Sequence, residues 1–160
     1  MVVAEALARL MRERWRLGFV DIGGWDTHVG QGGATGALAT RAGELGRGLA
    51  GFAAELGEAA WRDTVVVVMS EFGRTFRENG SRGTDHGHGS AMLVLGDGVR
   101  GGRMFGDWPG LDTPRLDQGV DQRYVVERGV QGLAQARLLR RASAALSVIG
   151  ASVINDARSS

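Results

Sequence analysis

Hydrophobic and polar positions alternate between helix-like and strand-like patterns along the first hundred residues. Apolar residues at helical spacing, with charged residues between them, predict a helix near the start and a second helix over residues 34–60. Short apolar runs predict strands at residues 18–24, 63–73 and 91–98. The four consecutive valines at 65–68 are typical of a parallel strand that is covered on both faces. This order of elements predicts the α/β class.

The segment that follows residue 119 has a different pattern. We expect residues 1–118 to form the carboxyl-terminal portion of a larger domain and residues 119–160 to form a divergent helical tail. The arginines between 137 and 141 are expected on the solvated face of that helix rather than in a nucleic-acid-binding patch. The apolar positions expected on its other face are Val126, Val130, Leu133, Leu138, Ala142, Ala145 and Ile149.

Composition narrows the class of protein without identifying a partner. The 160 residues, 43 % of them hydrophobic and 23 % charged, are ordinary for one globular domain or part of one. A formal net charge of +1 gives no electrostatic argument for binding nucleic acid or a membrane surface, and the apolar runs are too short to span a bilayer. The absence of cysteine excludes a thiolate nucleophile and a Cys-ligated zinc. The first residues lack the basic-then-apolar order of a secretion signal.

All three histidines of the chain lie in two glycine-flanked loops, "GGWDTHVGQ" and "GTDHGHGS", each beside an aspartate. Ligand groups in open α/β sheets gather at the carboxyl ends of strands, and one further carboxylate follows the valine-rich strand. Carboxylate oxygens mixed with imidazole nitrogens suit Zn²⁺, Mn²⁺ or Fe²⁺ better than Mg²⁺ or Ca²⁺. The six candidate ligands are Asp26, His28, Glu71, Asp85, His86 and His88.

The same residues have a simpler interpretation as turn residues. Asp26 would then close an Asx-turn or cap a helix, and His86 and His88 would be solvated loop side chains. From the residues alone, both interpretations stay open.

Two arginines flank the candidate ligands. Arg74 and Arg82 are candidates for holding an anionic ester, because a guanidinium pairs with phosphate or sulfate in a two-pronged geometry. The alternative is an ion pair with Glu78 or Asp85. Asn79 is a further candidate donor to an anion, although the Asn-Gly dipeptide is explained more simply by a turn.

The quoted loops and the segment "VVVVMSEFGRTFRENGSRGTDHGHGSAMLVLGDGVRGGRMFGDWPGL" resemble the carboxyl-terminal half of the domain-of-unknown-function 1501 family, over about residues 20–116. That family belongs to the alkaline-phosphatase-like, sulfatase-like superfamily. The resemblance implies a partial α/β/α sandwich with a mainly parallel sheet and metal ligands on loops at one edge. Asp26 and His28 would bind one metal, Glu71 would help to bind another, and His86 or His88 would complete the set.

The sequence departs from that superfamily at two points. Superfamily phosphatases commonly carry Asp-His after the central strand, where this chain has Glu71 and Phe72. Their nucleophile comes from the amino-terminal half of the fold. Because the resemblance covers only the carboxyl-terminal half, we expect this chain to lack that nucleophile. The hydroxyls of Thr27, Ser70 and Thr84 lie near the candidate ligands in sequence, but nothing marks any of them as the nucleophile.

The resemblance implies a parent protein that hydrolyses phosphate or sulfate esters with divalent metals, Zn²⁺ or Mn²⁺ being favoured. We expect the chain alone to be inactive or very weakly active, and to need the missing half or a partner chain to cover its sheet. The alternative is a non-catalytic module that binds a metal or a partner. Family members are usually exported. The tail after residue 119 departs from the family, and we hypothesise a changed reading frame or a gene fragment there.

Overall fold

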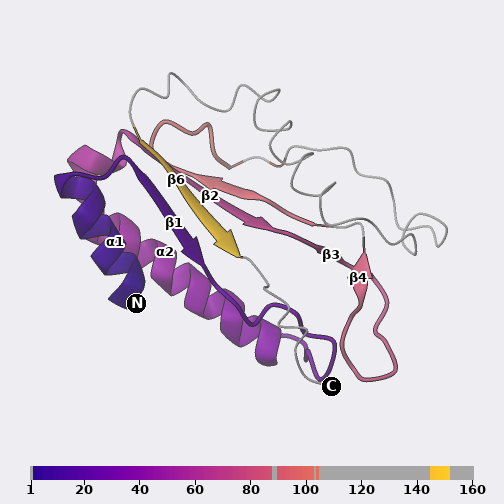
Figure 1. Cartoon of the computed structure of the whole chain (residues 1–160). Coiled ribbons are helices and arrows are strands. Elements are labelled where there is room, and N and C mark those ends of the chain that lie inside the picture. Colours follow the sequence, from indigo (N-terminus) through magenta and orange to yellow (C-terminus); the bar gives the residue numbers. More distant parts are fainter. Residues whose placement is uncertain (1, 88–89, 103, 105–144, 152–160) are drawn as a thin grey trace.

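The computed structural model describes residues 2–87, 90–102, 104 and 145–151. Both predicted helices and all three predicted strands form, with their ends shifted by a few residues. The elements are α1 (Val2–Glu13), β1 (Leu17–Asp21), α2 (Ala37–Trp61), β2 (Thr64–Ser70), β3 (Gly73–Arg74), β4 (His86–Gly87), β5 (Leu93–Leu95) and β6 (Ala145–Ala151), shown in Figure 1. The protein is therefore of the mixed α/β class.

The main sheet has four strands in the order β1-β6-β2-β5. β6 pairs in parallel with β1 and with β2, whereas β5 pairs antiparallel with β2. β5 therefore departs from the mainly parallel sheet that the resemblance implies. A parallel return needs a crossover of a dozen or more residues, usually a helix. Here the chain between β2 and β5 forms the small antiparallel pair β3-β4 instead, and it comes back along β2 in the opposite direction.

β6 overturns part of the predicted helical tail. Residues 145–151, which include two positions of the expected apolar helix face, form a strand between β1 and β2. Its register places Ile149 opposite both Val20 and Val68. Pairing on both sides satisfies backbone groups of three strands at once, which outweighs a helical spacing of apolar residues. Residues 126–144 of the expected helix lie outside the described part of the chain.

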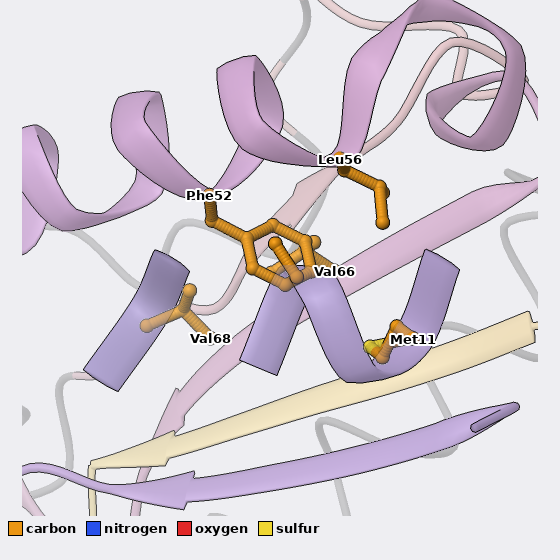
Figure 2. Packing of buried hydrophobic residues seen from close by; sticks show 6 residues of the cluster. Met11, Phe52, Leu56, Val66 and Val68 are labelled. Atoms are coloured by element: carbon orange, nitrogen blue, oxygen red, sulfur yellow. The ribbon is translucent and has the colours of Figure 1, made fainter. Parts of the chain in front are cut away.

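Both helices pack on the same face of the sheet (Figure 1). Phe52 and Leu56 of α2 meet Met11 of α1 over Val66 and Val68 of β2, as Figure 2 shows. Phe52 and Val66 are completely buried. The two valines lie two positions apart in β2 and therefore point to the same face. This cluster is the hydrophobic core of the described residues, and the candidate ligands lie outside it.

Gly18 in β1 lets α1 approach closely, because a Cβ there would lie 2.8 Å from Cδ1 of Leu7.

Over the part of the chain that the structure describes, no helix has the length and apolar character needed to cross a membrane.

Candidate metal centre

Two segments far apart in sequence build the site. The first is the loop of residues 22–31, which follows β1, and the second is the β3-β4 hairpin of residues 73–87, which follows β2 (Figure 1). The hairpin closes through an Asn-Gly turn, in which the backbone N–H of Asn79 donates to the carbonyl of Gly83 at 2.8 Å. Arg82 completes the turn in the left-handed backbone region, with φ of 58°. Its strands pair Arg74 with His86 and Gly73 with Gly87.

The two segments dock through their backbones. Gly30 N–H donates to the carbonyl of Ser81 at 3.0 Å, and Gln31 N–H donates to that of Arg82 at 2.9 Å. The contact is so close at Gly83 that a Cβ there would lie 2.2 Å from the carbonyl oxygen of His28. Glycine is therefore required for the loops to meet in this way. This docking brings Asp26 and His28 to the hairpin that carries His86.

Three of the six candidate ligands converge on one point. Nε2 of His28 lies 2.9 Å from Oδ1 of Asp26, and Nε2 of His86 lies 2.8 Å from the same oxygen. The ligand atoms of these three residues all lie within 4.8 Å of one another. All three side chains are partly buried, the Asp26 side chain being 22 % exposed. The loops thus gather one carboxylate and two imidazoles.

The other candidate ligands lie outside this group. Asp85 contacts the opposite nitrogen of an imidazole, its Oδ1 lying 3.1 Å from Nδ1 of His28, and its side chain is 61 % exposed. Glu71 lies partly buried directly after β2 and is not one of the three converging residues. His88 falls outside the described residues.

Arg74 binds protein groups rather than facing an open site. Its guanidinium lies 2.9 Å from Oδ1 of Asp26 and donates at 2.6 Å to the carbonyls of Trp25 and of Thr84. Its ion pair is therefore with Asp26. The sequence had suggested an ion pair with Glu78 or Asp85 instead. Arg82, the other arginine considered for an anion, is exposed on the hairpin turn.

The Phe72 ring packs against the imidazole of His86. Its ring is stacked on that of His86, with centroids 4.5 Å apart and planes 12° apart. The guanidinium carbon of Arg74 lies 4.7 Å from the centroid of the Phe72 ring. Phe72 is 5 % exposed. Phe72 thus packs its ring against the imidazole of His86, a role that the sequence did not indicate.

The charges around the site favour ionised carboxylates. Partial burial alone raises the pKa of the Asp26 carboxyl, but the hydrogen bond with His86 and the charges of His28, His86 and Arg74 outweigh burial and hold that pKa below its usual value. The hydrogen bond from Asn79, followed by that with His28, lowers the pKa of Asp85. Both carboxylates are therefore available as anions at neutral pH, the form that a metal ligand needs.

The group suits a transition-metal ion in donor type and in spacing. Ligand atoms around a tetrahedral Zn²⁺ lie about 3.3 Å apart, given bonds of about 2.0–2.1 Å. The contacts of 2.9 and 2.8 Å to Asp26 would have to open by only about half an ångström. One oxygen and two nitrogens form the donor mixture that favours Zn²⁺ or Mn²⁺ over Ca²⁺.

The fold and this site define a mixed α/β protein with a candidate transition-metal centre where two loops meet. The sequence pattern of the family described as "Protein of unknown function (DUF1501)" matches residues 3–131, which is more than half of the chain. The chain belongs to the DUF1501 family. Neither a curated protein nor a solved structure matches it.

Proposed function

We propose that this protein binds one divalent transition-metal ion, Zn²⁺ or Mn²⁺, through Asp26, His28 and His86. The observation that carries the proposal is the convergence of one carboxylate oxygen and two imidazole nitrogens within 4.8 Å, from loops that are distant in sequence. Turn residues have no need to meet in this way. Phe72 and Asp85 each hold one of the two imidazoles in place, as the outer partners of metal-binding histidines commonly do.

We further propose that the bound metal serves ester hydrolysis in an alkaline-phosphatase-like sandwich, to which this chain contributes the carboxyl-terminal part. Three protein ligands leave a coordination position for water or substrate, which is characteristic of catalytic rather than structural zinc sites. A metal there would polarise a phosphate or sulfate ester and lower the pKa of an attacking hydroxyl. The parallel pairing of β6 with β1 and β2 supports this sandwich.

The second candidate function is a module that binds a metal without catalysis. It is favoured by the position of Arg74, the best-placed arginine for an anionic substrate, because its guanidinium is bound to Asp26 and to two carbonyls. In this function the ion would hold the two loops together.

Calorimetric titration of chelator-treated protein with ZnCl₂ and with MnCl₂ tests the metal site. We expect one ion to bind per chain, and we expect Asp26→Ala to abolish measurable binding because it removes the shared carboxylate. Glu78→Ala is the matched control, since it removes an exposed carboxylate from the same hairpin. Wild-type protein that binds neither ion would refute the site.

Turnover of nitrophenyl phosphate and nitrophenyl sulfate separates the two functions. We expect the isolated chain to be inactive or very weakly active even with metal bound. Metal-dependent turnover that is lost in Asp26→Ala would establish hydrolysis and would overturn the expectation of inactivity. Metal binding without turnover, also in the presence of the amino-terminal part of the parent protein, would favour the non-catalytic module.

A further inference from the structure

Asn79 uses its whole side chain to join the two loops. Its Nδ2 donates to the carbonyl of His28 at 3.0 Å and to Oδ1 of Asp85 at 2.9 Å. Its Oδ1 accepts from the backbone N–H of Ser81 at 2.9 Å and of Gly83 at 3.0 Å. An amide side chain has two donor hydrogens and two acceptor lone pairs, and all four are used here. A residue that only formed a turn would have no need of the first two bonds.

Asp85 connects Asn79 to the imidazole of His28. One oxygen of Asp85 contacts Asn79 at 2.9 Å and Nδ1 of His28 at 3.1 Å. The opposite ring nitrogen, Nε2, then lies 2.9 Å from Asp26. The His28 ring is held at Nδ1 by Asp85, and the His28 backbone carbonyl is held by Asn79. The ring therefore has little freedom to turn, and Nε2 stays directed at the point where Asp26 and His86 meet.

We propose that Asn79 and Asp85 are positioning residues of the metal centre, and that neither is a ligand. The chain of contacts from Asn79 through Asp85 holds Nε2 of His28 toward the cation. This inference rests on the proposed metal site. Removing an outer partner of a ligating histidine typically lowers metal affinity about 10- to 100-fold.

The Asp85 variants separate a positioning residue from a ligand. Asp85→Ala should lower Zn²⁺ affinity about 10- to 100-fold in calorimetric titration. Asp85→Asn should restore most of that loss, because the amide oxygen can still accept from Nδ1 of His28. If Asp85 were a ligand, the amide would bind Zn²⁺ poorly and both variants would lose affinity to the same extent. Equal losses would therefore overturn the assignment, and the exposed position of Asp85 makes both variants compatible with folding.

The Asn79→Ala variant has a matched control in the same interface. Oε1 of Gln31 accepts from the hydroxyls of Thr27 at 2.8 Å and Thr84 at 2.7 Å, and so it also joins the two loops without touching the imidazole of His28. We expect Asn79→Ala to weaken Zn²⁺ binding and Gln31→Ala to leave it nearly unchanged. Equal weakening would mean that Asn79 only holds the loops together, and the inference would be wrong.

A measurement on the metal-free protein keeps this inference separate from the metal site itself. With only three histidines in the chain, nitrogen-15 NMR at low temperature can follow the Nδ1 proton of His28 and its exchange with water. We expect slow exchange in wild type and Gln31→Ala, and fast exchange in Asp85→Ala and Asn79→Ala. The same exchange rate in all four proteins would refute the positioning role, whether or not the wild type binds Zn²⁺. Slow exchange in a wild type that binds no Zn²⁺ would refute only the metal site and the ligand roles.

Discussion

The helix-covered core and the two-loop site hold their residues by different forces. In the core, Phe52, Leu56 and Val66 meet through apolar surface, and each is almost completely buried. In the site, Asp26 and His28 stay partly exposed and are held by hydrogen bonds and ion pairs. Apolar packing depends mainly on volume, whereas hydrogen bonds depend on direction.

The difference predicts different responses to substitution. A core of this kind accepts another apolar side chain of similar volume, because the burial of apolar surface is preserved. The site has less tolerance, since truncation of the Asn79 or Asp85 side chain to alanine removes directed contacts that no other side chain replaces. Stability should therefore be dominated by the core and metal affinity by the loops.

The largest effect on stability should come from Phe52→Ala. The side chain is completely buried between the helices and β2, and its removal leaves a cavity in the core. We expect a loss of about 3–5 kcal/mol in the free energy of unfolding, measured by urea denaturation. Phe52→Leu should cost clearly less, because it keeps most of the volume. Equal losses for the two variants would contradict a core that depends mainly on volume.

Gly83→Ala should separate the two regions. Its Cβ would lie 2.2 Å from the carbonyl oxygen of His28, so the hairpin and the loop have to move apart. We expect a cost of about 1–3 kcal/mol and the loss of Zn²⁺ binding, while the far-ultraviolet circular dichroism of the helices persists. Gly80→Ala is the control, because a Cβ at Gly80 would meet no heavy atom within 4 Å. Zn²⁺ binding that survives Gly83→Ala would show that the ligands do not depend on this docking.

The smallest effect should come from Phe72→Leu. The substitution keeps an apolar side chain next to His86 but removes the ring stack with it. We expect about 0.5–1.5 kcal/mol of lost Zn²⁺ binding energy, the usual value of an aromatic pair, measured by calorimetry. Phe76→Leu serves as the comparison, since Phe76 is 65 % exposed. A similar loss in both variants would remove the argument that Phe72 orients His86.

Several elements could be predicted from local patterns and others could not. The helical spacing in α2 and the valine run in β2 are local signals, and both elements form where the pattern placed them. The direction of β5 and the strand character of β6 depend on which strands lie beside them. No window of neighbouring residues contains that information.

The candidate site divides in the same way. The histidines beside aspartates in two loops indicated Asp26, His28 and His86, and the structure brings these three together. The Asn-Gly dipeptide also indicated the turn at Asn79. It did not indicate the hydrogen bond from the Asn79 side chain to the carbonyl of His28 in the other loop. The ion pair of Arg74 with Asp26 and the stacking of Phe72 on His86 could not be predicted. Both follow from the pairing of β3 with β4 and from the docking of the hairpin.

Taken alone, the sequence of 160 residues determines which segments become helix or strand in most of its first hundred positions, and which residues are candidate metal ligands. Those properties follow from side-chain type and from spacing along the backbone. Tertiary contacts decide which three candidate ligands converge on one point, and which neighbouring side chains orient the two imidazole rings. The reason is geometric, because a ligand set needs atoms placed within a few ångströms by strand pairing and loop docking, which join residues dozens of positions apart.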